Sequence, residues 1–203
     1  MPDILSNHSY RTGEVIKLFP EKIEDSDLVE ISSLIKGVKK HYQVDAYFHE
    51  SEYFKKNTDS ITAVLKKNNI NSFEKRLYAI SHVLLEIMLD RKILIEDRGC
   101  CDLLYSLLEE VDTDYIATLI KTNTKASDPA SVAKHFAGFR AARFLYEYTS
   151  DERLADLINN LSHRLGNKHF SPTDRDQFKF AIYDIENAIL KQKFPKFPVD
   201  SRI

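Results

Sequence analysis

Residues 76–95 read RLYAISHVLLEIMLDRKILI, and most of these positions are apolar. A helix that is apolar on all sides is usually a central, buried one. Within the stretch, His82, Glu86 and Asp90 recur every fourth residue, which lines them up along one stripe of a helix. Burying such a stripe costs on the order of several kcal/mol unless its groups are paired, protonated or bound to a metal. The stretch therefore predicts a central helix whose polar stripe needs a compensating partner.

A second polar stripe with the same spacing occurs in residues 37–54, GVKKHYQVDAYFHESEYF, where His41, Asp45 and His49 recur every fourth residue. Apolar residues at helical spacing precede it, so it also belongs to a predicted helix. Helical pairs four residues apart are a usual way to present two metal ligands. If the two helices pack face to face, we expect a divalent-metal site. Its candidate ligands are His41, Asp45, His49, His82, Glu86 and Asp90.

Imidazole combined with carboxylate suits Zn, Mn or Fe, and a carboxylate-rich set suits Mn or Mg. The alternative interpretation of each stripe is structural. His41 and Asp45 alone are typical of a surface pair. The stripes could also form a network of buried salt bridges and hydrogen bonds, in which lysine or arginine side chains compensate Glu86 and Asp90. The flanks of His82 and Glu86 are so apolar that the surface interpretation is weaker for them.

The composition is that of an ordinary globular protein, with 203 residues, 43% hydrophobic and 30% charged residues, and a net charge of −2. This charge gives no overall basic field to attract nucleic acid or an anionic membrane. We find no apolar run that could span a bilayer and no signal-peptide pattern. Cys100 and Cys101 are adjacent and make no disulfide framework. We therefore expect a cytoplasmic protein with neither nucleic acid nor a membrane as a partner.

Helix-breaking residues are sparse, since no proline occurs between Pro20 and Pro129. Residues 56–60, KNTDS, are expected to interrupt the helical pattern, and Asn71 or Ser72 to cap the central helix. Asp128 or Ser127 is expected to cap the next long helix. The pattern predicts a single all-α, bundle-like domain over residues 1–203, with about seven to nine helices. Residues 1–20 are expected to be an irregular lead-in and residues 194–203 an extended tail.

Two arginines on the predicted helix over residues 130–148 are candidates for phosphate binding. Arg140 and Arg143 follow His135 in the segment HFAGFRAARF. Arginine near a metal binds phosphate bidentately. The alternative is a solvated face, or salt bridges to Glu147 and Asp151.

Both stripes resemble a known family. Residues 37–54 are similar to the acyl carrier protein phosphodiesterase motif, which reads Gly-Ile-x-x-His-Arg-x-Ile-Asp-x-Phe-x-Asp. Residues 76–93 resemble the second helix of that family, although Arg91 follows Asp90 where the family has a histidine. The residues in register are Gly37, Val38, His41, Val44 and Asp45 in the first motif, and Arg76, Tyr78 and Asp90 in the second.

The resemblance implies an all-α fold related to the HD-type metal-dependent phosphohydrolases. It also implies dependence on Mn or Mg. The implied reaction is hydrolysis of the phosphodiester that joins phosphopantetheine to acyl carrier protein, which would be the partner.

The first functional hypothesis is a metal-dependent phosphoesterase, in which the metal activates a water molecule and polarises the phosphoryl group. In this hypothesis His82, Asp45 and Glu86 act as ligands or general base, while Arg140 and Arg143 bind a phosphorylated substrate. The second hypothesis is a non-catalytic helical protein whose stripes form a buried polar network and which acts by binding a partner. The third is a di-iron or oxygen-binding bundle of hemerythrin type, which uses the spacing of His82 and Glu86.

Overall fold

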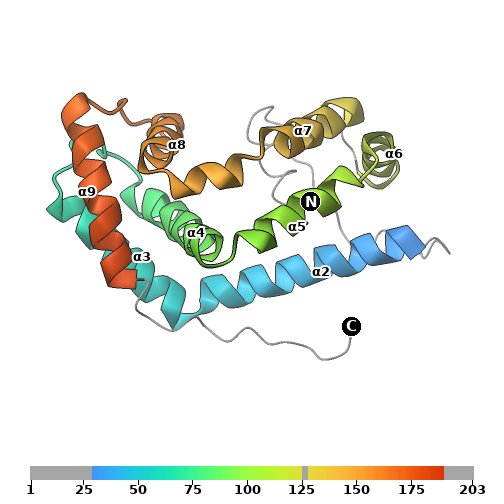
Figure 1. The fold of residues 1–203 in the computed structure, drawn as a ribbon, viewed down its shortest axis with the longest axis horizontal. Helices are drawn as coiled ribbons and strands as arrows, with labels where there is room; N and C mark the ends of the chain where they lie inside the picture. Colours follow the sequence, from blue (N-terminus) through green and yellow to red (C-terminus); the bar gives the residue numbers. More distant parts are fainter. Residues whose placement is uncertain (1–28, 125–127, 190–203) are drawn as a thin grey trace. The chain divides into compact units, whose positions relative to one another are not determined.

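The computed structural model of the chain describes residues 29–124 and 128–189. This part of the chain forms eight α-helices and one 3-10 helix and contains no strand (Figure 1). The prediction of an all-α protein with seven to nine helices is confirmed. The expected lead-in and tail lie outside the described residues. The elements are α2 (Val29–Glu50), α3 (Glu52–Lys67), α4 (Leu77–Glu96), α5 (Arg98–Glu109), α6 (Thr113–Asn123), α7 (Pro129–Ala142), η2 (Phe144–Thr149), α8 (Asp151–Arg164) and α9 (Pro172–Ile189).

The chain divides into two compact units, each built from two separate segments. In the described residues, the first unit contains residues 29–47 and 103–143, without 125–127, and the second contains residues 48–102 and 144–189. The boundaries fall inside α2 and α5, so each of these helices contributes residues to both units.

The first unit has a small apolar core in which α6 packs against α7, and residues of α2 join them. Asp128 caps α7 by accepting a hydrogen bond from the Ser131 amide at 3.0 Å, and Pro129 stands at the first turn. The predicted cap at Asp128 is therefore confirmed. The core residues are Val38, Ile116, Leu119, Ile120, Val132 and Ala133.

The second unit is organised around α4, as the apolar pattern predicted. This helix packs against α3, η2 and α8, and α3 also packs against α9. Four of its apolar side chains are completely buried, which is the role expected of a helix with few polar positions. They are Ile80, Leu84, Leu85 and Met88.

The predicted break at residues 56–60 is wrong, because these residues lie within α3. The break falls earlier, at Ser51, which caps α3 by accepting a hydrogen bond from the Phe54 amide at 3.1 Å. Asn57 is buried, and its side-chain amide donates to the Tyr53 carbonyl at 2.7 Å within the same helix. A polar side chain bonded back to its own helix is compatible with helical structure, although its sequence pattern favours a turn.

The predicted cap of α4 is also wrong. The helix begins at Leu77 and is preceded by Arg76, whose φ is 52°. The Ser72 hydroxyl instead donates a hydrogen bond to Asp174 at 2.6 Å, and the backbone N–H of Asn71 donates to the same carboxylate at 2.8 Å. These bonds join the α3–α4 loop to the start of α9, so the expected capping residues are used in a long-range contact.

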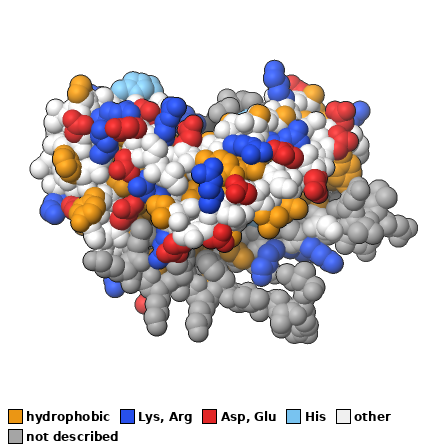
Figure 2. Space-filling view, in the orientation of Figure 1, with side chains coloured by type: hydrophobic (Ala, Val, Ile, Leu, Met, Phe, Trp, Pro, Cys, Tyr) orange, Lys and Arg blue, Asp and Glu red, His pale blue; other side chains and the backbone are white. Residues whose placement is uncertain are grey.

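The surface carries charges of both signs. On the face shown in Figure 2, acidic and basic side chains are interspersed among hydrophobic ones. None of the helices in the described part of the chain is both long and apolar enough to cross a membrane.

Candidate metal centre

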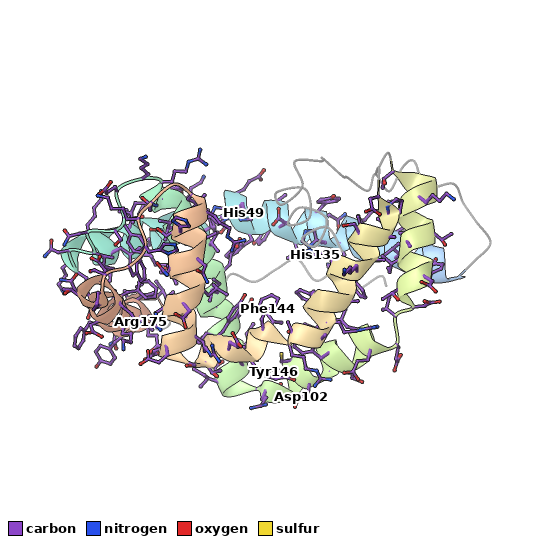
Figure 3. All side chains as sticks on the ribbon, turned by 90° about the horizontal axis from the view of Figure 1, so that it is seen from above. His49, Asp102, His135, Phe144, Tyr146 and Arg175 are labelled. Atoms are coloured by element: carbon purple, nitrogen blue, oxygen red, sulfur yellow. The ribbon has the colours of Figure 1, made fainter. Side chains whose placement is uncertain are left out.

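Three potential metal ligands converge in the second unit. His49 comes from the last turn of α2 and is labelled in Figure 3, while His82 and Glu86 lie one turn apart on α4. The two histidine Nε2 atoms are 2.9 Å apart. Glu86 Oε1 lies 3.1 Å from His49 Nε2 and 3.2 Å from His82 Nε2. Within residues 29–124 and 128–189, no other group of three or more histidine, cysteine or acidic side chains is arranged to hold a metal ion.

The turn between α2 and α3 places His49 beside this face of α4. The Ser51 hydroxyl donates to the Phe48 carbonyl at 2.6 Å and accepts from the Phe54 amide at 3.1 Å. These two bonds fix the chain on both sides of the bend that follows His49. On α4, the spacing of four residues places His82 and Glu86 on the same face.

With Glu86 ionised, hydrogens on the two imidazoles cannot satisfy all three contacts at once. Each Nε2 atom carries at most one hydrogen, and an ionised carboxylate oxygen only accepts. If only one histidine is protonated at Nε2, the other histidine and Glu86 face each other as two acceptors. If both are protonated there and donate to Glu86, no hydrogen bond joins the two nitrogens. With Glu86 ionised, one of the three close contacts therefore lacks a hydrogen bond, whereas a cation could take all three atoms as ligands.

The spacing of the three atoms fits ligands of one metal ion. Metal bonds to histidine nitrogen and carboxylate oxygen are about 2.1 Å long, so neighbouring ligands are about 3.0 Å apart at right angles and about 3.4 Å apart at the tetrahedral angle. The observed separations of 2.9, 3.1 and 3.2 Å fall near the first value. Two histidines and one carboxylate on one face of a metal are a known site for first-row transition metals.

The three candidate ligands and Asp90 are less buried than the apolar residues flanking His82 and Glu86 predicted. The side chains of His49, His82 and Glu86 are 27%, 34% and 41% exposed, and Asp90 is exposed. The stripe therefore lies on a side of α4 that the other helices leave partly open. Partial exposure lowers the desolvation cost and lets water reach the ligands, which catalytic metal sites with three protein ligands also require.

The end of α2 also favours a cation electrostatically. His49 is in the last turn of this helix of 22 residues. The last carbonyl groups of a helix carry a partial negative charge, which stabilises nearby positive charge. Glu86 adds a full negative charge on one side, so both elements that supply ligands attract a metal ion.

The other predicted ligands are not part of the three-residue cluster. Asp90 lies one turn beyond Glu86 on α4. His41 and Asp45 lie on α2 in the first unit. Their participation as ligands stays a prediction.

The two predicted phosphate-binding arginines belong to the first unit. Arg140 donates hydrogen bonds to the carbonyls of Leu108 at 3.3 Å and Val111 at 2.9 Å, near the end of α5. Arg143 forms an ion pair with Glu109. A phosphate would have to compete with these contacts, so phosphate binding by either arginine stays a prediction.

Two residues of the second unit were not identified from the sequence. Phe54 has its ring against both histidines, with ring centroids 4.7 Å apart in each case. Arg91 is nearly buried and holds Asp151 and Glu186 in ion pairs of 2.7 and 2.8 Å. An arginine inside an apolar run was the available signal for Arg91, whereas no spacing pattern marks Phe54.

No family model, curated protein or solved structure matched the chain. The three converging side chains are therefore the support for a metal centre in this chain.

Proposed function

We propose that the chain binds one divalent metal ion through His49, His82 and Glu86 and uses it to hydrolyse a phosphate ester. The observation that carries this proposal is the mutual spacing of the three ligand atoms, which lie 2.9–3.2 Å from one another. With Glu86 ionised, hydrogens on the two imidazoles cannot satisfy all three contacts at once, whereas one cation could accept all three atoms as ligands.

The charge of the ligand set supports hydrolytic chemistry. Two neutral imidazoles and one carboxylate leave a divalent ion with one net positive charge. Such an ion attracts an anionic phosphate oxygen, polarises the phosphoryl group and lowers the pKa of bound water. Because the three side chains are partly exposed, water and a substrate can approach this centre from outside the fold.

The substrate class is proposed from the family resemblance. The two segments that resemble acyl carrier protein phosphodiesterases, residues 37–54 and 76–93, are the ones that contain the three ligands. We therefore propose a phosphodiester as the substrate, and phosphopantetheine attached to acyl carrier protein as the first one to test. A di-iron site would need two ligand clusters. The described residues contain a single cluster, formed by His49, His82 and Glu86.

The activity test uses bis(p-nitrophenyl) phosphate with the purified chain in Mn²⁺, Zn²⁺, Fe²⁺ or Mg²⁺. Hydrolysis is expected with at least one metal and is expected to be lost in His82→Ala. His169→Ala is the matched control, because His169 is an exposed histidine of the same unit that stacks on His163 rather than on the cluster. Carrier protein bearing phosphopantetheine is then the second substrate.

Two results would contradict the proposal. Full activity in His82→Ala would show that the reaction does not use this centre. Absence of hydrolysis with every metal, on both substrates, would remove the phosphoesterase function and leave the cluster as a polar network or a non-catalytic metal site.

A further inference from the structure

An aromatic side chain packs against both histidines of the candidate metal centre. The ring centroids of His49, His82 and Phe54 are each 4.7 Å from the other two. Phe54 meets His49 at 75° and His82 at 81°, so both contacts are edge-to-face. Phe54 is 5% exposed, and its ring centroid is 5.2 Å from that of Phe48.

The orientation of an imidazole decides whether it can bind a metal here. Rotation about the bond between Cβ and the ring is soft, since such torsions have broad minima. A ring that swings out of its present plane carries Nε2 away from the other two ligand atoms. A half turn places the carbon Cε1 near the position that Nε2 occupies now. A partly exposed histidine therefore needs a neighbour that restricts this rotation.

Phe54 is placed to restrict both rings together. Its backbone is held by the bond from its amide to the Ser51 hydroxyl at 3.1 Å. The same hydroxyl donates to the Phe48 carbonyl, one residue before His49. The position of the phenyl ring is thus tied to the position of His49, and edge-to-face aromatic contacts have a preferred geometry.

We infer that Phe54 is a positioning residue for the metal centre, which orients the imidazoles of His49 and His82 so that their Nε2 atoms converge. This inference rests on the proposed metal binding. It assigns to Phe54 the role of holding the two imidazoles in the metal-binding orientation in the metal-free protein. It also explains why the two nitrogens lie only 2.9 Å apart. Metal affinity should therefore depend on a side chain that has no ligand atom.

The test is a titration of the purified full chain with Co²⁺, followed by the visible absorption of the bound ion. Phe54→Leu removes the ring, and Phe54→Met replaces it with a flexible side chain of similar size. Phe178→Leu is the matched control, because Phe178 is a completely buried phenylalanine of the same unit whose ring contacts are with Phe73 and Phe170. Thermal unfolding without metal measures the stability lost in each variant.

We expect both Phe54 variants to bind Co²⁺ about tenfold to a hundredfold more weakly, the range seen when groups that orient metal ligands are removed. The absorption spectrum of the bound Co²⁺ should also change. Phe178→Leu should lose stability but keep the wild-type affinity and spectrum. If Phe54→Leu does not fold, Phe54→Met decides the question.

Wild-type affinity and an unchanged spectrum in the Phe54 variants would overturn the inference while leaving the metal centre intact. Equal weakening in Phe178→Leu would also overturn it, because the effect would then follow from general loss of packing. If the wild-type chain bound no Co²⁺, the proposed metal centre itself would fail. The two proposals are therefore distinguished.

Discussion

Replacing Asp174 with asparagine removes one negative charge from the junction between the α3–α4 loop and α9. Asp174 is 3% exposed. It accepts hydrogen bonds from the Asn71 amide at 2.8 Å, the Ser72 hydroxyl at 2.6 Å, and the Ser171 amide and hydroxyl at 3.2 and 2.8 Å. In asparagine, an NH₂ group replaces one of the two accepting oxygens and faces N–H or O–H groups that also donate, so the hydrogen bonds to that oxygen are lost. Hydrogen bonds to charged groups contribute about 1.5–3 kcal/mol each.

Because Ser171 is exposed, water replaces part of its contribution, and we expect Asp174→Asn to lower the free energy of unfolding by about 3 kcal/mol at neutral pH. The effect should depend on pH. Burial raises the pKa of Asp174, but the hydrogen bonds outweigh burial and lower the pKa below its usual value. A lowered folded-state pKa means that the stabilisation is complete above the unfolded pKa of about 3.9 and disappears as the pH falls through the folded value.

The assay is urea unfolding followed by circular dichroism, from neutral pH down to about pH 3, below the ordinary aspartate pKa. The difference between wild type and Asp174→Asn should stay constant down to about pH 5 and shrink as the pH falls further. Asp176→Asn is the control, because the Asp176 side chain is 69% exposed and its carboxylate forms a surface ion pair with Lys179 at 3.4 Å. A difference below about 1 kcal/mol, the value of one ordinary hydrogen bond, would refute the reasoning. So would a difference that does not change with pH.

Two further predictions concern the second unit. Arg91→Met should lower the free energy of unfolding by about 2 kcal/mol, because the guanidinium bridges Asp151, Glu186 and the Tyr148 carbonyl, and partial exposure of the two carboxylates limits the loss. Urea unfolding measures this loss, with Lys92→Met, a half-buried neighbour, as the control. Equally small losses in the two variants would contradict the prediction. Removing metal with a chelator should lower the melting temperature of the Mn²⁺-loaded wild type but not of His82→Ala, since a ligand at a hundred times its Kd adds about 2.7 kcal/mol of stability. Scanning calorimetry measures the melting temperatures, and equal shifts in both proteins would contradict the metal site.

Much of the fold could be predicted because its signals are local. The apolar pattern of residues 76–95 identified α4 as a central helix, and Asp128 was identified as a cap from its position before Pro129. Ser72 was misassigned because its partner, Asp174, is 102 residues away in the sequence. Local propensity does not reveal that a distant carboxylate competes for a capping hydroxyl.

The candidate site was predictable in part for the same reason. The spacing of His82 and Glu86 is a property of one helix, so it could be recognised in the sequence. Their convergence with His49 depends on the bend at Ser51, which no pattern in the sequence specified. Phe54 was missed because an apolar residue near a helix start has no distinctive spacing, and its contact with two imidazoles exists only in the folded chain.

The most direct test of the metal centre is the metal content of the purified chain. Wild type, His82→Ala and His169→Ala would be incubated with Mn²⁺ or Zn²⁺, desalted and measured by inductively coupled plasma mass spectrometry. A three-ligand site predicts about one metal ion per chain in wild type and in His169→Ala, and almost none in His82→Ala. Equal metal content in all three proteins, or none in wild type, would contradict the metal centre formed by His49, His82 and Glu86.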